Sequence, residues 1–174
     1  FNYLSLHHNL FRNDAPGRDS LLARAMAEKM QRTVDRIYRL LGLIYPWKDI
    51  SAARWTLAHG DARSRSGAAE FLDNLLTGNV RKRIMPALED LPLNEKVRKG
   101  NVLLKSRPRD VEETLMQLVH DADQVVAAAA IHYVEERTLW NLAGDLEYAL
   151  EHRDVKDWYV FEAASWALAG WKRT

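Results

Sequence analysis

The residues of this chain with the clearest potential for chemistry are a histidine and two glutamates within one helical turn. His132 stands three and four positions before Glu135 and Glu136, a spacing that places an imidazole and a carboxylate on one helix face, as in di-metal bundles. Such a site needs more ligands from facing helices, and the comparable cluster in the sequence is the His-Asp-Ala-Asp string at 120–123. Because that string falls at a helix end, we predict no metal site.

Other catalytic and phosphate-binding patterns are missing from the sequence. The segment GDARSRSG at 60–67 has two glycines around a helix start, but no strand precedes it, so it does not predict a nucleotide-binding loop. Ser64 and Ser66 lie on a charged helical face without a histidine nearby in sequence. We therefore predict no catalytic residue, no cofactor and no enzyme activity.

The composition is that of a folded protein. Apolar residues make up 47 % of the 174 residues and charged residues 28 %, with a net charge of +1. The absence of cysteine excludes disulfides and thiolate chemistry and suits a reducing compartment, so we expect a cytoplasmic location. The longest apolar run, at 125–131, is far shorter than the ~20 residues that span a bilayer. Because the chain begins with Phe1 rather than Met, we expect a segment of a longer protein.

A repeat of about 31 residues organises the second part of the chain. Four leucines near helix ends recur at spacings of 31, 30 and 32 residues: Leu57, Leu88, Leu118 and Leu150. A polar break follows each leucine, and each break holds a residue able to cap the next helix: Asp61, Asn94, Asp123 and Asp154. One helical hairpin cannot bury its apolar stripe alone, whereas stacked hairpins can. The repeat therefore predicts an all-α fold, an α-solenoid of about four helical hairpins.

Apolar periodicity gives the expected helices. They span 2–11, 19–45, 48–59, 62–77, 79–90, 93–106, 110–120, 123–136, 138–152 and 155–170. The second helices carry the predicted core stripes: Ala68, Phe71, Leu72 and Leu75; Val97 and Leu104; Val126, Ala130 and Tyr133; Trp158, Phe161, Ala164 and Leu168. We expect one domain over 1–174, in which an N-terminal helical cap at 1–47, including the long helix, covers the repeats at 48–174.

The tryptophans add to the expected core and raise one question. Trp55, Trp140 and Trp158 fall near apolar stripes, so we predict that they are buried. Trp166 and Trp171 lie in the last helix and the tail, where no further repeat follows. The sequence leaves open whether the chain's own end packs these two rings or whether they mark a partner site.

Hairpins of this length, with Asp at the turn and a second helix rich in small residues, resemble HEAT repeats over 48–170. A more specific resemblance lies in DRIYRLLGLIYPWKDI at 35–50, GAAEFLDNLL at 67–76 and RKRIMPALED at 81–90. These segments are similar to the HEAT-repeat region of bacterial nucleotide-transporter-like (ADP/ATP translocase-related) membrane proteins. The resemblance implies a cytoplasmic domain detached from a membrane-embedded part, tethered to the inner membrane in the whole protein. It transfers no catalytic or nucleotide-binding residue.

Charge is unevenly distributed along the chain. Residues 81–109 hold nine Lys/Arg against three Asp/Glu, and residues 110–157 hold twelve Asp/Glu against three Lys/Arg. The pattern is typical of solvated helix faces or of a bipolar surface that orients a charged partner. With the repeats, it favours a non-enzymatic protein-interaction or scaffold module that binds a protein or peptide. We expect its partner-binding residues opposite the apolar stripes: Arg65, Asp73, Lys99, His132, Glu162 and Trp166.

An alternative hypothesis is a HEAT-like DNA-binding protein or alkylpurine DNA glycosylase. Such enzymes have a basic concave surface, and RKRIMP at 81–86 and KVRKGNVLLKSRPR at 96–109 could contact phosphates. The acidic segment that follows opposes this interpretation, because a nucleic acid would have to avoid half of the repeats. Binding to heparin or DNA separates the two hypotheses.

Overall fold

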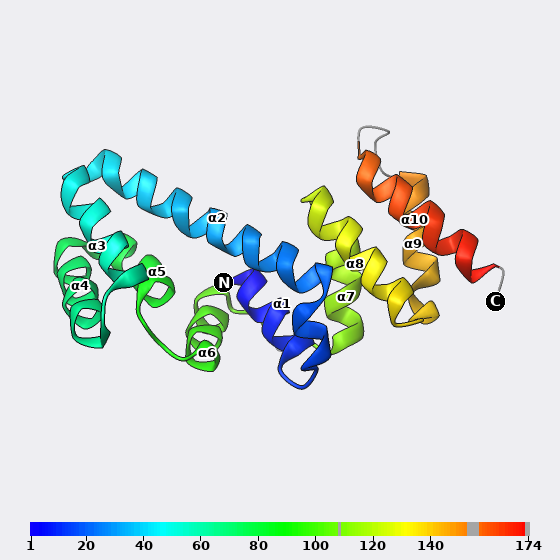
Figure 1. Ribbon diagram of the computed structural model, residues 1–174, viewed down its shortest axis with the longest axis horizontal. Coiled ribbons are helices and arrows are strands. Elements are labelled where there is room, and N and C mark those ends of the chain that lie inside the picture. Colours follow the sequence, from blue (N-terminus) through cyan, green and yellow to red (C-terminus); the bar gives the residue numbers. More distant parts are fainter. Residues whose placement is uncertain (108, 153–156, 173–174) are drawn as a thin grey trace. The chain divides into compact units, whose positions relative to one another are not determined.

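The computed structural model describes residues 1–107, 109–152 and 157–172, and every regular element in them is a helix. Figure 1 labels the α-helices in chain order. They are α1 (Asn2–Phe11), α2 (Leu21–Ile44), α3 (Trp47–His59), α4 (Ala62–Leu75), α5 (Gly78–Leu88), α6 (Leu93–Leu104), α7 (Val111–Val119), α8 (Gln124–Glu136), α9 (Ala143–His152) and α10 (Trp158–Trp171), with short 3-10 helices η1 (Pro16–Asp19) and η2 (Trp140–Leu142). The predicted all-α class is confirmed.

One predicted helix begins later than expected. The pattern predicts a single helix over 138–152, but Thr138 has a φ of 52°, in the left-handed region, and the 3-10 helix η2 precedes α9. Thr138 follows the last turn of α8, and the amide of Leu139 donates to the carbonyl oxygen of Val134 at 3.0 Å. This hydrogen bond is typical of a helix end whose next residue is left-handed, and glycine is the residue favoured at the position that Thr138 occupies.

The predicted caps have three outcomes. Asp61 accepts a hydrogen bond from the amide of Ser64 at 2.7 Å, and Asp123 accepts from the first amides of α8, so these two caps are confirmed. The cap at Asn94 is wrong, because α6 begins at Leu93 after a proline and Asn94 lies inside the helix. Asp154 lies outside the described residues.

The chain forms two compact units, which we describe separately. Unit 1 comprises Phe1–Ser5 and Lys29–Arg107, and unit 2 comprises Leu6–Glu28 and the described residues of Pro108–Thr174. In unit 1, α3 packs on α4 and α5 on α6, as the hairpin prediction requires. The core of unit 1 consists of Tyr38, Leu41, Ile50, Ala53, Leu72, Leu76, Met85 and Leu88. The single domain over 1–174 stays a prediction.

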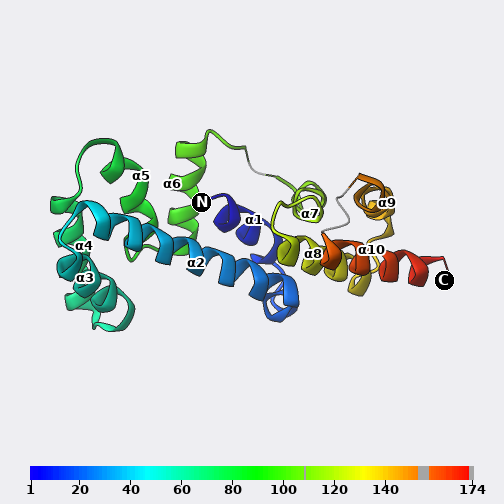
Figure 2. The same cartoon turned by 90° about the horizontal axis from the view of Figure 1, so that it is seen from above.

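Unit 2 packs α7 against α8 and α9 against α10, and α10 also lies along α8 (Figure 2). Its fully buried side chains come from α7 to α10 and from Leu6–Glu28, and the larger ones include Leu6, Phe11, Leu22, Met26, Leu115, Leu118, Val126, Ile131, Leu146 and Val160. A polar cluster joins these two parts. The Tyr133 hydroxyl donates to Asp14 at 2.7 Å, and the guanidinium of Arg137 donates to the same oxygen at 3.0 Å.

The predicted core stripes are correct in part. Leu72, Val97, Val126, Ala130, Tyr133, Ala164 and Leu168 are buried, whereas Phe71, Leu104, Trp158 and Phe161 are exposed. Trp55 was also expected in the core and is 64 % exposed, because α3 turns Ile50 and Ala53 inward and Trp55 lies on the opposite helix face. On α10 nearly every face is apolar, so periodicity identifies only Ala164 and Leu168 of the inward face and misses Val160 and Ala167.

Candidate functional site

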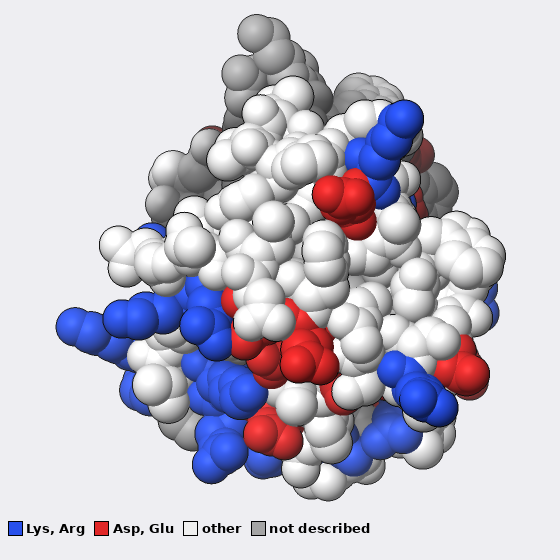
Figure 3. All heavy atoms as spheres, turned by 90° about the vertical axis from the view of Figure 1, so that its left-hand side faces the viewer, with Lys and Arg blue, Asp and Glu red and all other residues white. Residues whose placement is uncertain are grey.

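Three of the six predicted partner-binding residues lie in unit 1, and each has an ion-pair partner there. Arg65 pairs with Asp90 at 2.8 Å, and Lys99 pairs with Glu89 at 3.1 Å. Asp73 accepts two hydrogen bonds from the guanidinium of Arg81, which lower the pKa of Asp73. Figure 3 shows blue basic side chains beside red acidic ones on this end of unit 1.

The structure places Asp73 and Lys99 in separate hollows beside α5. Arg65 is held at the start of α4, where it also donates to the carbonyl oxygen of Gly60 at 3.0 Å. Their role in partner binding stays a prediction.

The other three predicted residues, His132, Glu162 and Trp166, line a single groove in unit 2. The groove lies between α8 and α10 and has a volume of about 720 Å³. Its remaining lining consists of Leu21, Val125, Ala128, Ala129, Glu135, Tyr159 and Ala163.

The local sequence explains why a groove forms here. On α8 the lining positions are 125, 128, 129, 132 and 135, and on α10 they are 159, 162, 163 and 166, so each set is one face of a helix. Alanine lines the groove on both helices, at Ala128 and Ala129 of α8 and at Ala163 of α10. Small residues leave a floor of methyl groups, and the larger side chains of Val125, Tyr159 and Trp166 stand at its edges.

The polar side chains of the groove are mainly acidic. His132 lies between two carboxylates, with Nδ1 at 3.6 Å from Glu135 and Nε2 at 3.4 Å from Glu136. Glu162 has no ion-pair partner among the described residues. No lysine or arginine lines the groove. The groove therefore combines apolar surface with carboxylates whose charge is not neutralised by a permanent cation.

The arrangement around His132 does not converge on one metal position. Glu135 faces Nδ1 and Glu136 faces Nε2 on the other side of the ring, so one ion could not bind the imidazole and both carboxylates. Within residues 1–107, 109–152 and 157–172, the structure holds no group of three or more side chains able to bind a metal ion.

Helix α10 exposes four large aromatic side chains. Trp158, Tyr159 and Trp166 are 60 %, 60 % and 70 % exposed, and Phe161 is 48 % exposed. A helix that is apolar on all sides is normally buried, so α10 presents more apolar surface than this unit covers. The two C-terminal tryptophans differ in their surroundings. Trp171 stacks on Trp140 with ring centroids 6.3 Å apart, whereas Trp166 is exposed.

The sequence predicted three residues of this groove, His132, Glu162 and Trp166, and missed the rest of its lining. Tyr159 was not selected, although its position three residues before Glu162 and seven before Trp166 places it on the same helix face. Leu21, which comes from the start of α2, could not be found from helical periodicity because it lies more than a hundred residues away in sequence.

Comparisons with known proteins give no assignment: no family model matches the chain, and no curated protein or solved structure does. The helices that the structure describes include none with the length and apolar character needed to cross a bilayer.

Proposed function

We propose that this chain is a non-enzymatic protein-interaction module whose binding site is the groove between α8 and α10. The observation that carries the proposal is a groove with an alanine floor, exposed aromatic edges and carboxylates without a lysine or arginine. An exposed apolar patch with a polar rim is typical of a protein-binding surface. The helical hairpins support the finer description of the fold as a HEAT-like α-solenoid, in which α8 and α10 would be the second helices of neighbouring hairpins.

Charge complementarity identifies the kind of partner. Glu135 and Glu162 stand on opposite walls of the groove, one on α8 and one on α10. A helix from another protein, with apolar residues facing the alanine floor and Lys or Arg at its flanks, would meet both carboxylates. Helices pack in grooves between side-chain rows at about 8–10 Å between axes, so a third helix is the element that this surface accommodates.

The resemblance of residues 35–90 to transporter-associated HEAT regions supports a further part of the proposal. The module would belong to the cytoplasmic side of a larger membrane protein, and the partner helix would come from that protein or from one bound to it. The gene upstream of Phe1 tests this origin. Several apolar segments of ~20 residues are expected there, and an upstream region without them would contradict it.

The nucleic-acid hypothesis has a direct test of its own. Arg81 and Lys99, which belong to its basic segments, are paired with Asp73 and Glu89. These pairs reduce the charge available to phosphates. Retention on heparin that falls steeply with salt would favour nucleic-acid binding, and passage through the column at low salt would exclude it.

A peptide selection tests the interaction module. A displayed library of 16-residue peptides is selected against the whole chain, and enriched peptides are synthesised for calorimetry. We expect apolar residues at helical spacing together with Lys or Arg. Glu162→Lys should weaken binding about tenfold because it places a cation in the groove. The matched control is Glu147→Lys, a charge reversal at an exposed position of α9 outside the groove.

Two results would overturn the proposal. One is enrichment of acidic peptides, which the carboxylates of the groove should repel. The other is an equal loss of affinity in the Glu162 and Glu147 variants, which would mean that general charge rather than the groove determines binding.

A further inference from the structure

A second cavity lies within unit 1, beside α2 and α3, and its chemistry differs from that of the groove. Its volume is about 690 Å³, within the range of ~300–1,000 Å³ typical of small-molecule sites. Its lining joins aromatic rings and cations from three helices, among them Tyr38, Arg54, Trp55, His59 and Lys96. The proposed interaction module makes no use of this cavity.

Lys96 brings to the cavity a cation without a counter-ion. Its ammonium group donates to a backbone carbonyl oxygen of α5 at 3.3 Å, and it has no ion pair within the described part of the chain. Burial lowers the pKa of Lys96, while Asp90 and Glu89 oppose that change. These two carboxylates already bind other cations, Arg65 and Lys99. An anion in the cavity would supply the charge that Lys96 lacks.

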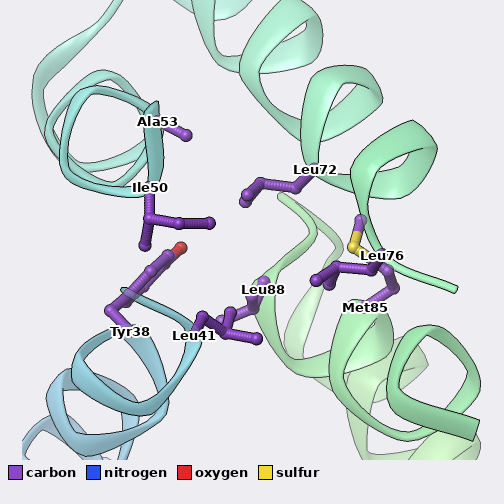
Figure 4. Packing of buried hydrophobic residues seen from close by; sticks show 8 residues of the cluster. All are labelled: Tyr38, Leu41, Ile50, Ala53, Leu72, Leu76, Met85 and Leu88. Carbon is purple, nitrogen blue, oxygen red and sulfur yellow. The ribbon is translucent and has the colours of Figure 1, made fainter. Parts of the chain in front are cut away.

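Tyr38 adds a hydroxyl group that is available to a ligand. The residue is 6 % exposed, and burial raises its pKa to about 12, so it is protonated at neutral pH. Figure 4 shows its ring extending from α2 toward α3, with the hydroxyl beside Ile50. Among the residues that the structure describes, this hydroxyl has no hydrogen-bond partner. A ligand with an acceptor oxygen would supply that partner.

The remaining charges at the cavity do not repel an anion. Asp35 is the one carboxylate in the lining, and it is already bound by Arg54 at 2.6 Å and by the amide of Gln31 at 3.1 Å. The guanidinium of Arg54 also lies over the Tyr38 ring, 5.9 Å from its centroid. Lys96 therefore differs from Arg54 in the same lining, because it forms no ion pair with the residues that the structure describes.

An aromatic surface borders the same cavity. Trp55 and His59 stack with ring centroids 5.2 Å apart and planes 27° from parallel. Trp55 is 64 % exposed, although tryptophan is a side chain that proteins usually cover. A flat apolar ring could lie against it.

We infer that this cavity binds a small aromatic carboxylate. The carboxylate accepts hydrogen bonds from the Lys96 ammonium and the Tyr38 hydroxyl, and the aromatic ring lies against Trp55. The site is distinct from the helix-binding groove in both position and ligand class, so the two can be tested separately.

Calorimetry with 2-naphthoate tests the inference on the whole chain. We expect binding to the wild type, and at least about tenfold weaker binding of 2-naphthalenemethanol, which keeps the rings but lacks the charge. Lys96→Met should weaken 2-naphthoate binding by at least about tenfold, because it removes a charge-assisted hydrogen bond. Lys48→Met is the matched control, because Lys48 is exposed on α3 and does not line the cavity.

Three results would overturn the inference. They are no binding of 2-naphthoate at millimolar concentration, equal binding of the alcohol, and equal weakening by Lys96→Met and Lys48→Met. Circular dichroism checks that the variants keep their helices. If Lys96→Met does not fold, the comparison of the acid with the alcohol on the wild type decides the question alone.

Discussion

Replacing Tyr133 with Phe tests the polar cluster that joins α8 to the loop after α1. The hydroxyl donates to Asp14 at 2.7 Å, and Asp14 also accepts hydrogen bonds from Arg137 and from the amide of Gly17. The Tyr133 ring meets Phe11 edge-on, with centroids 6.0 Å apart. Because Phe keeps this ring contact, the substitution removes one hydrogen bond to a charged group and little else.

The expected loss follows from the exposure of the acceptor. A hydrogen bond to a charged group contributes about 1.5–3 kcal/mol to stability. The Asp14 side chain is 25 % exposed, so solvent weakens the bond and the low end, about 1.5 kcal/mol, applies. Urea unfolding at pH 7, followed by tryptophan fluorescence, measures this loss of unfolding free energy. Tyr148→Phe is the matched control on α9, since Tyr148 is 54 % exposed, and it should change stability by less than about 0.5 kcal/mol.

The same cluster predicts a pH dependence. The hydrogen bond from Tyr133 is the largest of the causes that lower the pKa of Asp14 below 3.8. A carboxyl whose folded pKa is lowered adds stability above its unfolded pKa and loses it as pH falls through the folded value. The difference between wild type and Tyr133→Phe should therefore be constant from pH 7 to pH 5 and shrink below pH 3.8. A variant as stable as the wild type at pH 7, or a difference that persists undiminished at pH 2.5, would refute the reasoning.

Three other substitutions have defined outcomes in urea unfolding. Thr138→Gly should stabilise the chain by about 1 kcal/mol, because it removes the backbone strain of a β-branched residue with a φ of 52°. A loss of stability would contradict this. Asp110→Ala should cost about 1 kcal/mol, because Asp110 accepts from the amide of Glu113 at the start of α7; Asp110→Asn, which can still cap, should cost less. Tyr38→Phe should remove an alkaline loss of stability. The folded pKa of Tyr38, about 12, lies above its unfolded value of 10.0, so its contribution is complete below pH 10 and falls by about 1.4 kcal/mol at pH 11; equal alkaline losses in wild type and variant would contradict this.

Helix positions were predictable from the sequence because local signals determine them. Apolar periodicity and helix caps both depend on residues a few positions apart in the sequence. Asp61 and Asp123, for example, cap the helices that begin directly after them. The exception at Thr138 arises from a residue in a conformation that its type disfavours, for which no local signal exists.

The candidate site was predictable only where one helix face determines it. His132, Glu162 and Trp166 were selected as residues opposite apolar stripes, and they meet in the groove. The same rule selected Arg65 and Lys99, but their partners Asp90 and Glu89 lie in the connection after α5. Periodicity within one helix does not encode such pairs.

The cavity of unit 1 shows the same limit more strongly. Tyr38, Trp55 and Lys96 come from three helices, and Lys96 is 58 positions after Tyr38 in the sequence. In sequence each has an ordinary interpretation, as a core tyrosine, a core tryptophan and a surface lysine. Their combination becomes visible only when the helices are packed.

The most direct test of the groove as the binding site compares two tryptophans of α10. Trp166 lines the groove and Trp158 does not, although both are exposed on the same helix. For a selected basic peptide, Trp166→Ala should weaken binding about 30-fold, the loss of about 2 kcal/mol typical of an interface hot spot, and Trp158→Ala should leave the affinity within about twofold. Equal losses in the two variants, or a larger loss in Trp158→Ala, would contradict the account.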